Sequence, residues 1–326
     1  MMKSVILVGG LTGLALFAAT GRAEEPPPFL LQWGSTGSGP GQFSYPFGIA
    51  VDNAGDVYVT EYGNHRVQKF TSAGTLITSW GSFGTDDGEF DVPNGIAVDN
   101  DGNVFVVDQN NHRIQKFSSS GTFLLKWGTL GIGDGQFRLP RGIAVDQSGV
   151  IYVTDGDNAR AQKFTNTGAF LTKWGSFGSG DGQFNSPFHL TTAGGAVFVV
   201  DYWNHRIQKF TSDGVFMGKW GTLGDGDGQF REPTGIASDP LGRVFVSDRF
   251  NSRMQKFSAS GVFLTKWGVL GDGAGEFHFP TGVAVDTDGF VYVTDQQGAS
   301  DRVQKFGFVA TPTISASWGQ IKVRYR

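Results

Sequence analysis

The sequence contains no cysteine and, beyond its first 23 residues, no apolar run long enough to cross a membrane. The first absence excludes disulfides, thiolate metal sites and cysteine nucleophiles. The second predicts that no membrane-spanning helix follows the N-terminal segment. Charged residues make up only 17% of the chain, and the formal net charge is -4. Nucleic-acid-binding domains normally carry a basic face, so this balance argues against a nucleic-acid partner.

The abundant residue types exclude two further classes of protein. Glycine accounts for 50 of the 326 residues, but it does not recur at every third position, which excludes collagen. Aromatic residues make up 13% and hydrophobic residues 39% of the chain, which is too much apolar side chain for an intrinsically disordered protein. The composition therefore predicts a folded, glycine-rich protein.

Residues 1–23 have the features of a secretory signal peptide. Lys3 precedes a short apolar run over residues 4–19, and Gly21 and Ala23 are small residues at the positions before a cleavage site. We expect cleavage after Ala23 and bacterial export, giving a periplasmic or secreted protein that is monomeric and not integral to the membrane. Residues 24–28 then form a short linker. An uncleaved membrane anchor is the alternative.

One unit of sequence recurs six times, at steps of 46 or 47 residues. Its most regular element is a Trp-Gly pair, and a proline and a Gln-Lys-Phe triplet recur in step with it. The tryptophans are Trp33, Trp80, Trp127, Trp174, Trp220 and Trp267, and the prolines are Pro46, Pro93, Pro140, Pro187, Pro233 and Pro280. Self-similarity at this period is typical of propellers and other repeat architectures.

Each unit contains four strand signals. In the second copy these are residues 95–99, 104–107, 113–117 and 122–127, and an Asn-Asp-Gly-Asn turn separates the first two. Helical periodicity is absent, so the chain is expected to be all-β. Four short antiparallel strands in about 47 residues match one blade of a β-propeller.

The number of strands predicts how the ring closes. Six copies of the first three strands lie between Pro46 and Phe306, whereas the first Trp-Gly strand, Phe29–Trp33, precedes every blade. We therefore predict a six-bladed β-propeller over residues 29–306, in which the N-terminal strand is the outer strand of the sixth blade. This arrangement leaves no unpaired edge at the seam.

The repeated motifs resemble those of the NHL-repeat family. They include Gly-Ile-Ala-Val-Asp at 95–99, Val-Tyr-Val-Thr-Asp at 291–295 and Arg-Ile-Gln-Lys-Phe at 113–117. The resemblance covers about residues 29–306 and implies a six-bladed propeller. Such propellers include peptide-amidating lyases, lactonase-like enzymes, sensor domains and binding modules. The zinc-binding histidines of the lyases are expected after the repeat proline, where this chain has neither histidine nor carboxylate.

Residues present in every blade are interpreted as structural. The repeated tryptophans and phenylalanines are expected to pack within and between blades. An acidic residue ends the second strand of each unit, and an arginine follows it after five residues in five copies. We expect these pairs to brace loops. They are Glu61–Arg66, Asp108–Arg113, Asp155–Arg160, Asp201–Arg206, Asp248–Arg253 and Asp295–Arg302.

Residues that differ between blades are the candidate binding residues. One set follows each repeat proline, and the other follows the strand-two acid. Aromatic residues and arginine at such positions commonly anchor partners. The candidates are Phe47, Asn94, Arg141, Phe188, Tyr62, Tyr202, Trp203, Arg249 and Phe250. We expect both sets on one face of the ring. The alternative is that the aromatic residues only cover the mouth of the central channel.

The histidines fall into two groups. His65, His112 and His205 share one slot in three blades, too far from the axis to converge on one metal ion, so loop hydrogen bonding is expected. His189 replaces the glycine of the other five blades, and Ala193 replaces the repeat aspartate in the same unit. This break in the pattern makes His189 a further candidate site residue, and relaxed constraint is the alternative explanation.

These observations predict a non-catalytic binding or scaffold module for a protein, peptide or glycan, with no catalytic residue, metal ligand or cofactor assigned. The alternative is a metal-dependent hydrolase or lyase with a divalent ion in the central channel. Gly-Asp connectors such as residues 224–228 lack the closing glutamate of an EF-type calcium loop and are interpreted as turns. The tail, residues 307–326, is either a loosely docked terminus or a sorting signal.

Overall fold

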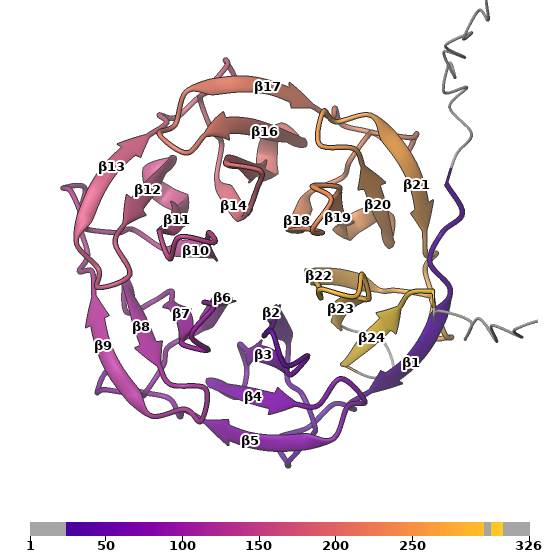
Figure 1. Cartoon of the computed structure of the whole chain (residues 1–326), viewed down its shortest axis with the longest axis horizontal. Coiled ribbons are helices and arrows are strands. Elements are labelled where there is room, and N and C mark those ends of the chain that lie inside the picture. Colours follow the sequence, from indigo (N-terminus) through magenta and orange to yellow (C-terminus); the bar gives the residue numbers. More distant parts are fainter. Residues whose placement is uncertain (1–23, 297–300, 309–326) are drawn as a thin grey trace, which may run out of the picture.

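The computed structural model describes residues 24–296 and 301–308, which form six four-stranded antiparallel sheets arranged as blades around a central axis (Figure 1). This arrangement confirms the all-β, six-bladed propeller predicted from the repeat. The predicted signal peptide (1–23), the insertion near Gly298 and the tail beyond Phe308 lie outside the described residues.

The inner strand of each blade lies at the channel, and its outer strand lies on the circumference (Figure 1). Blade 1 comprises β2 (Pro46–Val51), β3 (Val57–Glu61), β4 (Arg66–Phe70) and β5 (Leu76–Trp80). Blade 2 comprises β6 (Pro93–Val98), β7 (Val104–Asp108), β8 (Arg113–Phe117) and β9 (Phe123–Trp127). Blade 3 comprises β10 (Pro140–Val145), β11 (Ile151–Asp155), β12 (Arg160–Phe164) and β13 (Phe170–Trp174).

Blades 4 and 5 follow the same order, and blade 6 takes its outer strand from the N-terminus. Blade 4 comprises β14 (Pro187–Ala193), β15 (Ala196–Asp201), β16 (Arg206–Thr211) and β17 (Phe216–Trp220). Blade 5 comprises β18 (Pro233–Ser238), β19 (Val244–Asp248), β20 (Arg253–Phe257) and β21 (Phe263–Trp267). Blade 6 comprises β22 (Phe279–Val285), β23 (Val291–Gln296), β24 (Arg302–Phe306) and β1 (Phe29–Trp33). Single-turn 3-10 helices follow β11, β15 and β19 at Gly156–Asn158, Tyr202–Asn204 and Arg249–Asn251.

The ring has two different faces. The connector face carries the glycine-rich connectors between blades, such as residues 81–92, and the loops between second and third strands, such as residues 109–112. The turn face carries the tight turns at the other end of the strands, such as residues 99–103. Backbone hydrogen bonds tie the loops to the connectors, for example from Asn110 N to Asp91 O at 3.1 Å.

The N-terminal strand closes the ring as predicted. β1 pairs antiparallel with β24, with Leu31 opposite Lys305 and Trp33 opposite Val303. Figure 1 shows β1 beside β24 at the end of the chain. Because β1 and β24 share one sheet, separating the sixth blade from the first would break both a strand pairing and an apolar interface.

The apolar core lies between neighbouring blades. Trp80, from the outer strand of blade 1, lies 6.3 Å from the Tyr58 ring of its own blade and 5.9 Å from the Phe117 ring of blade 2. It also packs over Gly121, where a Cβ atom would come within 2.6 Å of the indole and φ is +87°. Glycine is therefore required there. These contacts confirm that the repeated aromatic residues pack within and between blades.

The repeated arginines hold the connectors in place. Arg113 Nε lies 2.6 Å from the Asp108 carboxylate, and both side chains are buried. The same guanidinium donates hydrogen bonds to the connector carbonyl oxygens of Thr85, Asp86 and Glu89 at 2.6–2.9 Å. All six acid–arginine pairs form, which confirms the predicted loop bracing. We call each such group a connector clamp.

Replacing Arg160 by alanine tests the contribution of one connector clamp. The change leaves the Asp155 carboxylate buried without its partner, so we expect the free energy of unfolding to fall by about 3–5 kcal/mol. Lys173→Ala is the matched control in the same blade, because the Lys173–Asp134 pair is about half exposed and worth only about 0–1 kcal/mol. Urea denaturation of both variants measures the difference, and equal losses would contradict this role for the clamp.

Truncation at the N-terminus tests ring closure. Removal of residues 1–33 takes away β1 and exposes the edge of β24, so we expect loss of cooperative unfolding or dimerisation through that edge. Removal of residues 1–23 alone is the control and should leave a folded monomer. Thermal denaturation and size-exclusion chromatography report both properties. A folded, monomeric protein without β1 would show that the seam contributes little.

Candidate binding face

The two sets of variable residues meet on the connector face, as predicted. In blades 1 to 4, the residue after the proline contacts a residue that follows the strand-two acid. The Phe47 ring stacks on Tyr62 at 4.4 Å, and Phe188 stacks on Tyr202 at 5.2 Å. In blades 2 and 3 the contacts are polar: Asn94 Nδ2 donates to Gln109 Oε1 at 2.6 Å, and Arg141 lies 3.6 Å from the Asp157 carboxylate.

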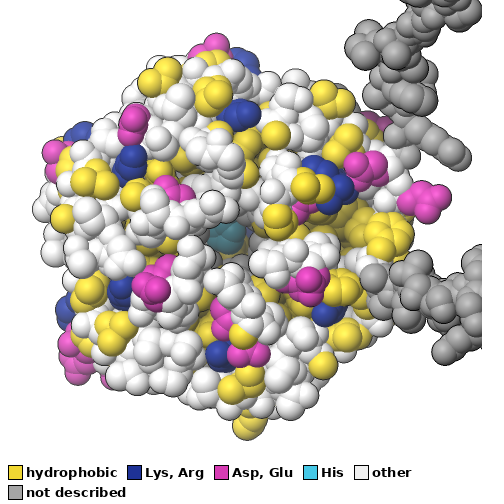
Figure 2. All heavy atoms as spheres, viewed as in Figure 1, with side chains coloured by type: hydrophobic (Ala, Val, Ile, Leu, Met, Phe, Trp, Pro, Cys, Tyr) yellow, Lys and Arg dark blue, Asp and Glu magenta, His cyan; other side chains and the backbone are white. Residues whose placement is uncertain are grey.

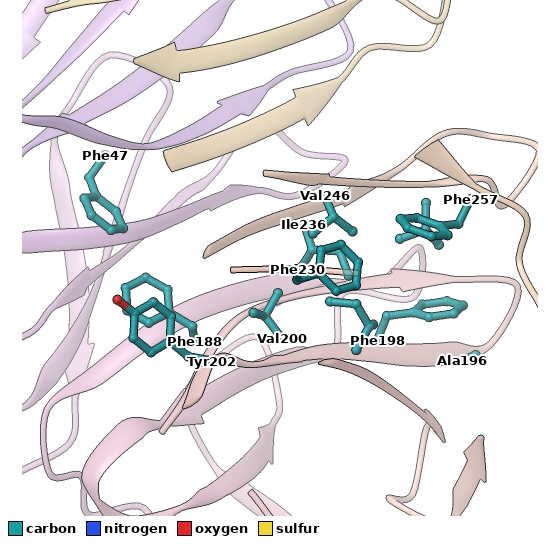
Figure 3. Close-up of a cluster of buried hydrophobic side chains, with 12 residues drawn as sticks. Phe47, Phe188, Ala196, Phe198, Val200, Tyr202, Phe230, Ile236, Val246 and Phe257 are labelled. Atoms are coloured by element: carbon teal, nitrogen blue, oxygen red, sulfur yellow. The ribbon is translucent and has the colours of Figure 1, made fainter. Parts of the chain in front are cut away.

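Four of these aromatic residues close the channel at the connector face. We call Phe47, Tyr62, Phe188 and Tyr202 the aromatic plug. The Phe47 and Phe188 rings, from blades 1 and 4, approach to 5.7 Å. Figure 3 shows the Phe188 and Tyr202 rings lying together, with Phe47 facing them from another blade. Phe47, Phe188 and Tyr202 are buried. The plug thus presents little free surface, in agreement with the alternative that these rings cover the channel mouth.

An arginine, Arg141, and a glutamate, Glu232, contact the plug. The Arg141 guanidinium lies 4.9 Å from the Phe188 ring centroid, a cation–π contact. The Tyr202 hydroxyl donates a hydrogen bond to Glu232. Burial and the neighbouring Glu232 carboxylate raise the pKa of Tyr202 to about 12, so this hydroxyl remains a donor at neutral pH.

His189 lies beneath the plug and spans the channel. Its Nε2 atom is 3.1 Å from Asn94 Oδ1 in blade 2, and its ring meets Phe47 of blade 1 edge-on at 5.7 Å. Because the Asn94 amide nitrogen donates to Gln109, the amide oxygen accepts from His189, which places the ring proton on Nε2. Burial, together with the Arg141 charge, lowers the pKa of His189 to about 3, so the imidazole is neutral at physiological pH.

The channel is open on the turn face only. Below the plug it narrows to a cavity of about 40 Å³ that includes His189, Leu190 and three inner-strand glycines in its lining. It then widens to about 230 Å³ between the inner strands, where residues such as Val51 and Val98 line it. Figure 2 shows a face of the ring whose centre is hollowed, with a histidine side chain visible inside. The channel is therefore a blind hollow.

Three predicted residues lie beside the plug and are more accessible. Trp203 is 51% exposed and Phe250 is 42% exposed. The Arg249 guanidinium lies 5.3 Å from the Phe250 ring and 5.4 Å from the Phe279 ring, so it is held between two aromatic faces. These side chains come from blades 4 and 5, on one side of the ring.

A set of exposed apolar residues on the connectors was not predicted from the sequence. Each lies three positions after the repeat tryptophan, and the exposed fractions are between 59% and 74%. The set is Phe83, Leu130, Phe177, Leu223 and Leu270, with Thr36 at the equivalent position before blade 1. Recurrence of an apolar residue after Trp-Gly was the available signal, but periodicity alone cannot tell an exposed connector position from a packed one.

The shared histidine slot has a structural role. His65 Nδ1 accepts a hydrogen bond from Val92 N at 3.2 Å, and His112 and His205 do the same for Leu139 and Glu232. The three donating residues, Val92, Leu139 and Glu232, directly precede the repeat prolines and have left-handed φ values of 48–58°. The predicted loop hydrogen bonding is confirmed. The structure adds that each histidine holds a residue in an unfavourable backbone conformation.

The described residues offer no cluster of metal-ligating side chains. Over residues 24–296 and 301–308, no group of three or more histidine, aspartate or glutamate side chains could hold a metal ion. His189, the one histidine lining the hollow in this range, has only an amide as polar side-chain partner. The side chains around the channel therefore do not fit a metal centre.

The lowered pKa of His189 predicts a pH dependence of stability. The unfolded chain binds a proton near pH 6.5, whereas the folded protein binds it only near pH 3, so stability falls as the pH falls through this range. Between pH 7 and pH 4 the wild type should lose about 3 kcal/mol more than His189→Asn. Urea unfolding at both pH values measures this difference, and equal losses in the two proteins would contradict a buried neutral imidazole.

Comparison with known proteins identifies the repeat. The NHL repeat model matches residues 43–70, 90–117, 137–164, 230–257 and 277–306, and the matched ranges omit blade 4. No curated protein matches the chain.

Several solved structures share the fold. Virginiamycin B lyase from Staphylococcus aureus is 15% identical, with a TM-score of 0.57 over 86% of this chain and 99% of the lyase. A streptogramin B lyase is 17% identical, with a TM-score of 0.58 over 82% of this chain and 94% of that one. A nidogen/laminin complex matches with 18% identity and a TM-score of 0.52, over 68% of this chain and 79% of that one. Together, the matched repeats and the ring of blades show that the chain carries NHL repeats and folds as a six-bladed β-propeller.

Proposed function

We propose that this protein is a non-catalytic binding module that holds a protein, peptide or glycan on its connector face. The observation that carries the proposal is the set of exposed apolar side chains on that face. Phe83, Leu130, Phe177, Leu223 and Leu270 place one such side chain on each of five connectors, and Trp203 and Phe250 lie on the adjoining loops. Exposed apolar patches on soluble proteins commonly mark interaction sites.

The residue types on this face favour a protein or peptide among the possible partners. Trp203, Arg249 and Phe250 are of the types that dominate protein interfaces energetically. The connector aspartates of four blades pair with lysines of the adjacent outer strands, so acid and base are balanced around the rim. Exposed aromatic and apolar side chains together with paired charges are a composition found at protein interfaces.

The connector clamps make the face rigid before a partner arrives. In blade 3, Arg160 donates to the carbonyl oxygens of Ile132, Gly133 and Gln136 at 2.7–2.8 Å. Ile132 and Leu130 are thereby held outward on an ordered backbone. Pre-organisation of this kind reduces the entropic cost of binding.

The enzymatic alternative has one supporting observation. His189 places a neutral imidazole at the floor of a hollow that opens on the turn face. Two of the similar structures are lyases by name, but at 15–17% identity the likeness shows the fold alone. A metal-dependent hydrolase or lyase would further need ligands that the described residues around the channel do not offer.

We further propose that the protein acts in the periplasm or outside the cell. The support is the N-terminal sequence, with Lys3, an apolar run and Ala23 in the order of a signal peptide. Within the described part of the chain, no helix is long and apolar enough to cross a membrane.

Partner capture by a double variant tests the proposed function. We expect Trp203→Ala combined with Phe250→Ala to lower partner recovery from native extracellular material at least tenfold, because both side chains are exposed beside the plug. Leu171→Ala combined with Met217→Ala is the matched control, since these side chains are about equally exposed but lie on outer strands. Equal recovery with both double variants, or chelator-sensitive activity with bound metal in the same preparation, would contradict the proposal.

A further inference from the structure

Blade 4 differs from the other blades on the turn face, opposite the proposed binding face. Its first two strands join through Gly194 and Gly195 alone, with φ values of +57° and +76°, and Ala193 pairs with Ala196. Two consecutive positive φ values are typical of a type I′ hairpin turn. The repeat aspartate is missing, because Ala193 occupies its position.

In blade 1 the corresponding aspartate has two roles. Asp52 Oδ1 accepts hydrogen bonds from the backbone N–H groups of Ala54 and Asp56 at 3.0 and 2.9 Å, which shapes the turn. Asp52 Oδ2 accepts from the Tyr58 hydroxyl at 2.9 Å and lies 3.5 Å from Lys69 Nζ. Lys69 is the lysine of the repeated Gln-Lys-Phe triplet, so the aspartate of this turn supplies a negative charge to that lysine.

In three blades the lysine of the triplet pairs with a carboxylate, and the source of that carboxylate differs between them. In blade 1, Lys69 also pairs with Asp56 of its own turn at 2.9 Å. In blade 3, Lys163 pairs with Asp213 of the neighbouring blade at 2.9 Å. In blade 5, Lys256 pairs with Glu24, which precedes the propeller. In blades 1, 3 and 5 this position therefore pairs with a carboxylate, whichever segment provides it. In blades 2 and 6 the ammonium group instead donates to Asn166 Oδ1 at 2.7 Å and to Ser72 O at 3.4 Å.

In blade 4 both local sources of a carboxylate are missing. Ala193 stands in place of the repeat aspartate. The neighbouring blade 5 has Ser260 at the position equivalent to Asp213, the residue through which blade 4 pairs with Lys163 of blade 3. Lys209 Nζ donates to Ala259 O at 3.0 Å and lies 5.2 Å from the Phe198 ring. Among the described residues, no carboxylate lies within ion-pair distance of this lysine.

A pocket lies beside this lysine. It has a volume of about 350 Å³, and its lining combines Lys209 with apolar side chains, among them Phe198, Met217 and Leu241. A second pocket of about 490 Å³ lies across the short hairpin and includes Tyr152 and Ser212 in its lining. Both volumes are in the range of small-molecule sites. The short Gly194–Gly195 turn lines both pockets.

We propose that the Lys209 pocket binds a carboxylate carried on an apolar body, either a free organic acid or the terminal carboxylate of a polypeptide. The ammonium group takes the charge that Asp56, Asp213 or Glu24 supplies to the equivalent lysines, and the apolar body lies against Phe198, Met217 and Leu241. The site is independent of the connector face, because it lies at the opposite end of the strands.

Calorimetric titration of the mature chain tests this site with defined probes. Hexanoate represents a free acid, N-acetyl-leucine represents a chain terminus, and their primary amides are the uncharged controls. We expect at least one acid to bind at least tenfold more tightly than its amide, and salt to weaken this binding. The tighter acid identifies the source of the carboxylate.

Three variants locate the site. Lys209→Gln removes the charge, and Ala193→Asp restores the carboxylate found in other blades, so each should weaken acid binding at least tenfold. Lys116→Gln is the matched control, because Lys116 is the equivalent lysine of blade 2, two blades away, and donates to Asn166 of blade 3 at 2.7 Å. Thermal denaturation checks that every variant is folded. The proposal is overturned if neither acid binds, if the amides bind equally well, or if Lys209→Gln and Ala193→Asp both bind as tightly as Lys116→Gln.

Discussion

The connector clamp is the interaction on which the rest of the molecule depends. A glycine-rich connector has few side chains with which to hold its own conformation, so its order must come from another segment. Each clamp arginine supplies it by joining a buried carboxylate to several connector carbonyl oxygens, as Arg253 does with Asp248 and with Asp225, Gly226 and Gln229. The neighbouring glutamine and asparagine complete the group, since Gln255 and Asn251 bond to both the acid and the connector. These hydrogen bonds fix the conformation of the connectors.

Sixfold repetition makes each departure from the pattern informative. Blade 4 carries two of them, on the same inner strand. At the connector end of β14, His189 replaces a glycine and reaches across the channel to Asn94. At the turn end, Ala193 replaces an aspartate, and the short hairpin borders two pockets. The NHL repeat model omits this blade from its matches, which agrees with the same substitutions. The symmetric ring thus has one distinct sector, and that sector contributes to the lining of the blind hollow and of the two largest pockets described.

The parts of the structure that were predictable are those repeated in the sequence. The predicted ends of the blade 2 strands lie within two residues of the observed ends, because Pro93, the Asn-Asp-Gly-Asn turn and Trp127 mark where those strands begin or end. The closure by β1 followed from the order of the strand signals, because the first Trp-Gly strand precedes every blade and the sixth blade lacks a fourth strand of its own. The packing of Trp80 and the pairing of Asp108 with Arg113 also followed, since a residue needed in every blade serves the blade itself. Local sequence decides these features because strand alternation and turn chemistry act over a few residues.

The candidate site was only partly predictable. The sequence placed Phe47, Tyr62, Phe188 and Tyr202 on one face, but it did not show that the rings of blades 1 and 4 meet across the axis and bury one another. That contact depends on the diameter of the ring, which all six blades set together. The exposure of Phe83 and Phe177 also depends on how the blades are arranged. A connector side chain is buried only if the neighbouring blade extends far enough to cover it.

Taken alone, the order of residues determined the blade, the number of blades and the way the ends of the chain join, because those properties rest on short-range pairing repeated six times. Only the tertiary structure decided which variable side chains are covered, that the channel is blind, and that Lys209 stands without a carboxylate beside a pocket. Those properties arise between segments that are distant in sequence, where the distance between side chains depends on how all the blades pack.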